Sequence, residues 1–173
     1  MLTVNNVPMK KRRQAGKNEI WQAALYVRLS REDGDKEESD SVINQKELLQ
    51  QYAALEPDII VHDVYMDDGW SGTNFERPEF IRMMSDIWNG EVDCVIVKDL
   101  SRFGRNYIDV GQYIEKIFPL MNIRFISVTD NLDSVKNPQT MNNIIVPFKN
   151  LINDEYCRDI SNKVRSSLDM KRK

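Results

Sequence analysis

Apolar segments that alternate with segments of helical periodicity constrain the fold of this chain more than any other feature. The four apolar segments span residues 23–29, 58–68, 93–97 and 122–130. The three helix-forming segments between them span residues 41–55, 78–90 and 107–118. Pro78 suits a first helical turn, Gly90 a helix end, and Pro119 is expected to stop the third helix. This order predicts an α/β fold with a central, mostly parallel sheet of four to five strands flanked by helices.

The composition favours one soluble domain. With 173 residues, of which 41% are hydrophobic, the chain can bury a single core. It has no apolar run of 18 residues and no signal peptide, so we expect a cytoplasmic protein that does not enter a membrane. Cys94 and Cys157 are expected to be ordinary thiols, His62 a structural residue, and the three tryptophans and the stretch FIRMM part of the core.

Basic charge is concentrated at the two ends. Residues 1–17 carry five basic residues and no acid, and residues 158–173 carry six basic residues and two acids. Residues 18–157 are left with 13 basic and 25 acidic residues, a net charge of −12. Such ends on an acidic body suggest nucleic-acid contact, although a solvated tail would explain residues 1–17 equally well.

Polar residues follow the expected strands where parallel α/β sheets bind ligands. Tyr26, Arg28 and Ser30 alternate along the first strand and should therefore share a face. Arg102 and Arg105 follow the third strand and are three residues apart, which would place them on one side of a helical turn, and Gly104 between them permits close approach. Several arginines without matching acids predict a phosphate ligand.

The phosphate is expected to belong to a polymer. The sequence contains neither a P-loop nor a GxGxxG motif, which disfavours a bound nucleotide. A serine hydroxyl beside arginines could attack a phosphoryl group while the guanidinium groups stabilise the developing charge. Taken singly, the same residues have simpler readings, since Ser30 could cap a helix and Arg102 and Arg105 could pair with Asp99 and Asp109.

Five motifs together resemble the catalytic domain of the serine recombinases. They are YVRLS, NQ within SVINQKELL, DDGWSGTNFERPEF, VKDLSRFGRNY and RFISVTDNLDS, and they occur in the family's order and spacing. This version looks like the large serine recombinases of transposons and phages. The resemblance implies a catalytic domain at residues 20–156 and the truncated start of a basic linking helix at residues 157–173. The basic leader at residues 1–19 lies outside the resemblance and is expected to be disordered.

The resemblance also implies roles for individual residues. Ser30 matches the nucleophile that forms a 5′-phosphoserine bond to DNA. The residues that match catalytic arginines are Arg28, Arg77, Arg102 and Arg105. The residues expected to support the site are Tyr26, Gln45, Ser71 and Ser101, and those expected to contact DNA from the linking helix are Lys163 and Arg165. Many resolvases carry an aspartate where this chain has Ser101, so the identity of the general acid stays open.

The implied reaction is DNA strand exchange in the integration or excision of a mobile element. The serine ester retains the energy of the broken bond, so neither a metal nor another cofactor is expected. The implied partners are double-stranded DNA and further copies of the chain, as a dimer and as a tetramer at synapsis, in a bacterial or phage-encoded protein. No small-molecule substrate is expected, and the isolated domain should be inactive.

Two other functions remain open from the sequence. A metal-dependent nuclease or phosphatase could use aspartates near strand ends, namely Asp63, Asp67, Asp68, Asp93 and Asp99. Alternatively, the domain could only assemble on DNA, without catalysis. A covalent adduct through Ser30 would distinguish catalysis from assembly.

Overall fold

The computed structural model describes residues 20–29, 42–72, 75–141 and 143. The strands are β1 (Trp21–Leu29), β2 (Ile59–Asp68), β3 (Cys94–Val97), β4 (Arg124–Ser127) and β5 (Leu132–Asp133). The helices are α1 (Val42–Leu55), α2 (Pro78–Asn89), α3 (Leu100–Phe103), α4 (Tyr107–Gln112) and α5 (Phe118–Met121), with a π-helical segment η3 (Tyr113–Ile117) between α4 and α5. The expected leader and linking helix lie outside the described residues.

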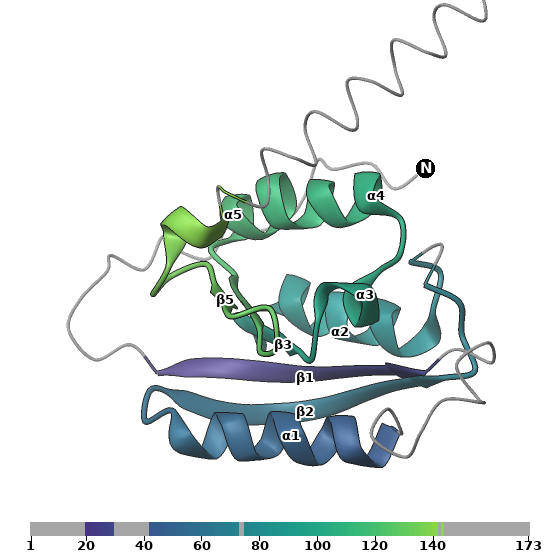
Figure 1. Ribbon diagram of the computed structural model, residues 1–173, viewed down its shortest axis with the longest axis horizontal. Helices are drawn as coiled ribbons and strands as arrows, with labels where there is room; N and C mark the ends of the chain where they lie inside the picture. The colour runs from purple at the N-terminus through teal and green to yellow at the C-terminus, as the bar shows by residue number, and fades with distance from the viewer. Residues whose placement is uncertain (1–19, 30–41, 73–74, 142, 144–173) are drawn as a thin grey trace, which may run out of the picture.

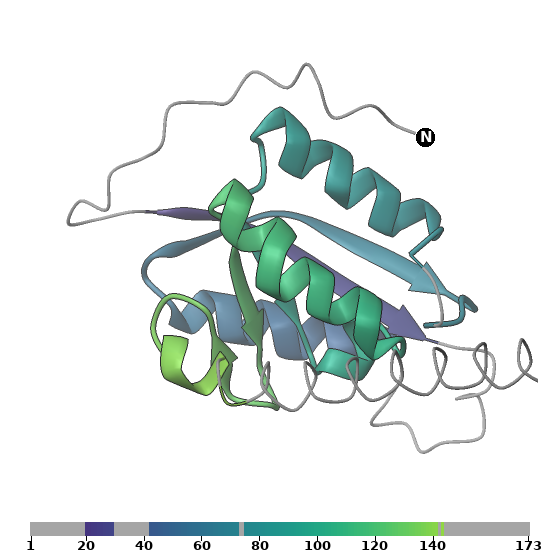
Figure 2. The ribbon, with the colours of Figure 1, turned by 90° about the horizontal axis from the view of Figure 1, so that it is seen from above.

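The five strands form one sheet in the order β2-β1-β3-β4-β5. All neighbouring pairs are parallel except β4 and β5, which are antiparallel. Helix α1 covers one face of the sheet, while α2 and the α4 to α5 segment cover the other (Figures 1 and 2). The predicted α/β fold with a mostly parallel sheet is therefore confirmed.

Alternation along β1 divides the core into two layers. Leu25 and Val27 pack with Leu49 of α1, whereas Tyr26 packs with Phe80 of α2 and with Phe103. The side chain of Arg28 also points to the α2 side, because it contacts α3 there. The prediction that Tyr26 and Arg28 share a face is confirmed.

The third predicted helix continues beyond the expected stop at Pro119. The backbone N–H of Phe118 bonds the carbonyl of Tyr113, an i to i−5 bond of the π-helical segment. Pro119 then occupies the first turn of α5. A proline is tolerated there, because its missing N–H removes few of the hydrogen bonds of the helix. The helix ends at Asn122, whose backbone is left-handed with φ 56°.

The tryptophans differ from the prediction that all three belong to the core. Trp70 and Trp88 are 43% and 47% exposed. The stretch FIRMM lies largely in the core, since Phe80, Met83 and Met84 are buried, whereas Ile81 is exposed and Arg82 is partly exposed. Cys94 is a buried free thiol whose pKa is raised by burial, as expected of a core cysteine.

Candidate active site

Three loops meet at the carboxyl ends of the central strands. The amide of Gly69, in the loop after β2, donates to the carbonyl of Leu29 at the end of β1 over 2.8 Å. In the same loop, the carbonyl of Gly72 accepts a 2.7 Å hydrogen bond from the amide of Arg105, which follows α3. Segments 40 and 33 residues apart in sequence, from Leu29 to Gly69 and from Gly72 to Arg105, are thus tied together by their backbones.

Arg28 lies at the centre of this junction and has no exposed surface. Its Nη1 donates to the carbonyl of Trp70 at 3.0 Å. Its Nη2 donates to the carbonyl of Ser101 at 2.8 Å, and its Nε to that of Arg102 at 3.2 Å. The side chain therefore joins the loop after β2 to the end of α3.

The arginines of the site crowd around one another. Burial, followed by the positive charges of Arg77 and Arg105, lowers the pKa of Arg28 to about 10. Arg102 adds a smaller like-charge contribution in the same direction. Arg28 remains a cation at neutral pH, and a phosphate close to this cluster would relieve the repulsion between its guanidinium groups.

Gly72 makes the close approach of two arginines possible. A Cβ atom at this position would lie 2.8 Å from Cγ of Arg105 and 3.0 Å from Nη2 of Arg28. Any larger residue would force one of these side chains to move. Sequence reasoning missed Gly72, although a glycine in the WSG motif after a strand was a signal for tight packing.

Arg77 is enclosed rather than presented at the surface. Its guanidinium lies 4.8 Å from the ring centroid of Phe75 and 5.1 Å from that of Phe80. Nη1 donates to the Tyr26 hydroxyl at 2.7 Å and Nη2 to the carbonyl of Phe103 at 2.8 Å. Burial lowers its pKa against the opposing influence of Tyr26 and Asp67.

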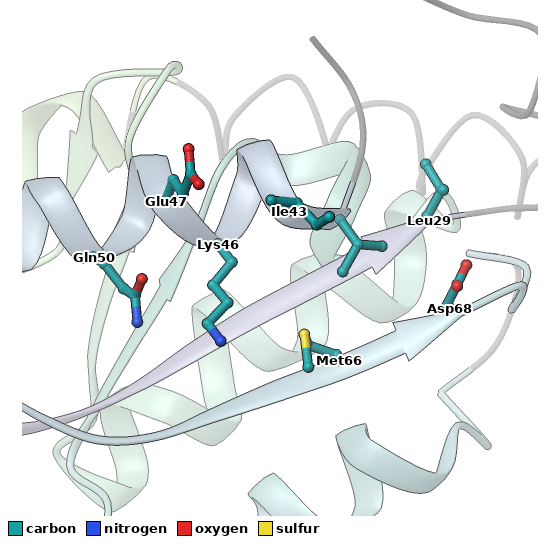
Figure 3. Close-up of a pocket in the computed structure, with 8 residues that line it drawn as sticks. Leu29, Ile43, Lys46, Glu47, Gln50, Met66 and Asp68 are labelled. Atoms are coloured by element: carbon teal, nitrogen blue, oxygen red, sulfur yellow. The ribbon is translucent and has the colours of Figure 1, made fainter. Parts of the chain in front are cut away.

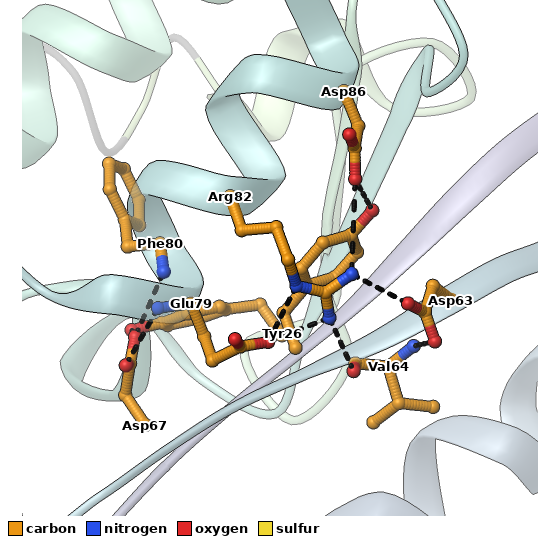
Figure 4. A network of polar contacts seen from close by, with 9 residues as sticks. Tyr26, Asp63, Val64, Asp67, Glu79, Phe80, Arg82 and Asp86 are labelled. Atoms are coloured by element: carbon orange, nitrogen blue, oxygen red, sulfur yellow. Dashed lines mark hydrogen bonds and ion pairs between the residues drawn. The ribbon is translucent and has the colours of Figure 1, made fainter.

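Tyr26 passes this contact on to α2 through Asp67. Its hydroxyl donates to Asp67 over 2.8 Å, and the same carboxylate accepts from the amides of Glu79 and Phe80, each at 3.0 Å (Figure 4). Burial raises the pKa of Tyr26, so the hydroxyl stays protonated and can donate. Asp67 thus caps the first turn of α2. The sequence offered Asp67 as a possible metal ligand, whereas in the structure it accepts hydrogen bonds from Tyr26 and from α2.

The short helix α3 carries Arg102. Its first residue, Leu100, donates its amide to Asp130, and Asp99 accepts hydrogen bonds from the amide of Arg102 and the hydroxyl of Ser101. Arg102 is 7% exposed, and its Nε lies 4.0 Å from a carboxylate oxygen of Asp99. The Asp99 contact that the sequence left open is therefore present.

The predicted helical arrangement of Arg102 and Arg105 is wrong. Helix α3 ends at Phe103, and Gly104 has an extended backbone with φ −168°. A Cβ atom at Gly104 would lie 2.8 Å from Phe75 and 2.8 Å from Val110, so neighbouring side chains occupy the space beside this glycine. Arg105 instead joins the cluster through its contacts with Gly72.

The remaining predicted site residues are distributed around this cluster. Ser71 and Ser101 are exposed at its rim. Gln45 is buried in α1, on the opposite face of the sheet from Tyr26, because α1 packs on Leu25 and Val27. The residues outside the described part of the chain are Ser30, Lys163 and Arg165.

The aspartates of the metal-site hypothesis do not form one group. Asp63 pairs with Arg82, and Asp67 caps α2 (Figure 4). Asp99 caps α3. Asp93 directly precedes β3 and accepts from the amide of Gln22, at the other end of the sheet from Asp67 and Asp99. Within the described residues, no three potential metal ligands lie together.

A groove of about 620 Å³ lies on the other face of the sheet, between α1 and the ends of β1 and β2 (Figure 3). Its lining residues are Leu29, Val42, Ile43, Lys46, Glu47, Gln50, Met66 and Asp68. They include one basic residue against two acids, so the groove offers no cluster of cations for a phosphate.

In the part of the chain that is described, no helix has the length and apolar character needed to cross a bilayer.

Comparison with known proteins identifies the kind of catalytic domain that the five sequence motifs resemble. Residues 23–173 match the family model "Resolvase, N terminal domain". The N-terminal catalytic domain of TP901-1 integrase is 28% identical, with a TM-score of 0.65 over 80% of this chain and 98% of that chain. A resolvase family site-specific recombinase from Streptococcus pneumoniae is 27% identical, with a TM-score of 0.66 over 88% of this chain and 99% of that chain.

Proposed function

Since this chain belongs to the resolvase family of serine recombinases, we propose that it cleaves and rejoins DNA during site-specific recombination. In this proposal the Ser30 hydroxyl attacks a DNA phosphodiester. The serine hydroxyl gives up its proton as its oxygen forms a bond to phosphorus, the bond to the 3′ oxygen breaks, and that oxygen takes up a proton and leaves as a hydroxyl. The 5′-phosphoserine ester is later attacked by a 3′-hydroxyl of the exchanged strand, which regenerates Ser30.

One observation carries the proposal: arginines from two chain segments that are far apart in sequence meet at the end of β1. Arg105 and Arg102 lie close enough to Arg28 to lower its pKa, and a phosphodiester is the anion that DNA would supply there. Leu29, the residue before Ser30, is bonded through its carbonyl to the loop that contacts Arg28. This placement supports an attack on a phosphate held by the same arginines.

The proposed roles follow the described contacts. Arg102 and Arg105 would bind the phosphoryl oxygens, with Arg28 directly behind them. Arg77 and Tyr26 would hold the site together through their buried hydrogen bonds. Ser71 and Ser101 would support it from the rim, and Gln45 from α1. Asp99, which bonds Ser101 and the amide of Arg102, is a candidate to position the proton donor.

The proposed partners are double-stranded DNA and further copies of the chain. Strand exchange joins two duplexes, so four active serines are needed, one for each strand that is cut; we therefore propose a dimer on each duplex and a tetramer at synapsis. Lys163 and Arg165 would contact DNA next to the catalytic domain. We place this activity in the cytoplasm, where bacterial and phage DNA is found.

The test is a covalent adduct assay with the full-length protein on DNA that contains its recombination site. We expect the native protein to form an adduct through the 5′ end of the cut strand, and to form it equally when a chelator is present. Ser30→Ala should form none, while Ser71→Ala and Ser101→Ala should still form it. An adduct that persists in Ser30→Ala, or that disappears with chelator, would overturn the proposal.

A further inference from the structure

Helix α3 ends in carbonyl groups that its own turns cannot satisfy. The last carbonyls of any α-helix lack intrahelical donors, and in a four-residue helix they make up most of the element. The amide of Gly104 satisfies the carbonyl of Leu100. The carbonyls of Ser101 and Arg102 accept from Arg28, and that of Phe103 accepts from Arg77.

Two buried arginines therefore cap the helix that carries Arg102. A cation at a helix C-terminus is favourable because the carbonyl dipoles point toward it. Arg28 does more than cap, because its third bond reaches the carbonyl of Trp70 in the loop after β2. That loop holds the backbone of Arg105 through Gly72.

We infer that Arg28 is a positioning residue that fixes Arg102 and Arg105 relative to each other before DNA binds. This inference rests on the proposed function for its meaning, but its structural part concerns the protein alone. Three of the five N–H groups of Arg28 are engaged by backbone carbonyls, and its side chain is buried. Its first task is to join the two loops, and its charge acts on the phosphate through the arginines that it holds.

Arginine and lysine separate this role from a purely electrostatic one. Both are cations, but arginine spreads its donors over three nitrogens of a planar fork, whereas all three donors of lysine are on a single nitrogen. Arg28→Lys keeps the charge and loses the fork. Arg82→Lys is the matched control, since Arg82 also uses its fork, on Glu79 and Asp63, and joins α2 to β2 without being among the charges that act on Arg28.

The first experiment is amide hydrogen exchange of the 173-residue chain without DNA. In Arg28→Lys we expect the amides of Gly104 and Arg105, which bond within and between the two loops, to exchange about tenfold faster. Amides of β3 should keep their native rates, and Arg82→Lys should change neither group. Native rates at Gly104 and Arg105, or an equal rise in β3, would overturn the inference.

Gly72→Ala provides an independent variant that keeps every arginine. The added Cβ would press on Arg105 and on the guanidinium of Arg28 at 3.0 Å or less, and so disturb the same junction from the other side. We expect the same tenfold rise at Gly104 and Arg105. If Arg28→Lys does not fold, this variant alone decides, and native exchange rates in it would overturn the inference.

A second measurement concerns catalysis by the full-length protein. At saturating DNA, Arg28→Lys should lower the single-turnover rate of adduct formation at least tenfold, with the Kd for DNA and its salt dependence within twofold of native. A Kd that weakens while the adduct rate is kept would overturn the positioning role. Failure of the native protein to form an adduct would instead overturn the proposed function and leave the exchange result standing.

Discussion

At the scale of single residues, the site is held by hydrogen bonds that link buried groups in series. The Tyr26 hydroxyl accepts from Arg77 and donates to Asp67, and Asp67 in turn caps α2. The sequence identified Tyr26 and Arg77 through the motifs that contain them. It could not identify the carbonyl partners of Arg28, because every residue has a carbonyl and only the fold selects which three lie within reach.

Removal of one hydroxyl should test this series. Tyr26→Phe leaves Nη1 of Arg77 buried without its acceptor and takes one donor from Asp67, so we expect a loss of about 2 kcal/mol in the free energy of unfolding. Tyr113→Phe is the control, since the Tyr113 hydroxyl has no hydrogen bond to another described residue while its ring packs in the same aromatic cluster. Equal losses in urea denaturation of the two variants would contradict the role of the hydroxyl.

At the scale of elements, a buried arginine joins segments at the opposite end of the sheet from the candidate site. Arg124 of β4 forms two hydrogen bonds with Asp133 of β5 and one with Asp58, which precedes β2.

The strand and helix segments were predictable because hydrophobic periodicity is local. The antiparallel β5 and the π-helical segment before Pro119 were not, because long-range pairing and helix packing determine them.

The Arg124 to Asp133 pair should make stability depend on pH in acid. Burial raises the pKa of Asp133, but the hydrogen bonds from Arg124 and from two backbone amides outweigh it, and the pKa lies below its ordinary value of 3.8. A depressed folded pKa contributes stability that is complete above the ordinary value and is lost as the pH falls through the folded one. The free energy of unfolding of the native chain should therefore decrease below about pH 4.

Asp133→Asn separates this contribution from other carboxylates. It should cost about 3 kcal/mol at pH 7, because buried Arg124 loses one of its two charged partners and keeps only Asp58, and its stability should change less between pH 5 and pH 3. Glu76→Gln, at an exposed position, should keep the native pH dependence. Urea denaturation at pH 7, 5 and 3 measures all three proteins, and parallel curves for Asp133→Asn and the native chain would refute the assignment.

At the scale of the whole molecule, the chain brings cations to one edge of an acidic body. Residues 18–157 carry a net charge of −12, yet four arginines meet around the end of β1. Sequence motifs predicted that these residues act together, and in the fold Arg28 donates to backbone carbonyls and Arg77 to the Tyr26 hydroxyl. Binding of DNA should therefore depend on a few local phosphate contacts.

The salt dependence of DNA binding should show how many phosphate contacts the protein makes. We expect the affinity of the full-length protein for DNA to fall with salt, and Arg105→Ala to reduce the slope of log Kd against log salt by about one. Arg82→Ala, which alters a guanidinium already paired with Glu79 and Asp63, should leave the slope unchanged. Fluorescence anisotropy at several salt concentrations measures the slopes, and equal slopes for both variants would mean that Arg105 binds no phosphate.

The central claim is that Ser30 becomes covalently joined to the DNA that these arginines bind. Mass spectrometry of the proteolysed adduct tests it most directly, because it locates the nucleotide on a single side chain. The account predicts a 5′-phosphate attached to Ser30 alone. A nucleotide on Ser71, on Ser101 or on any other residue would contradict it.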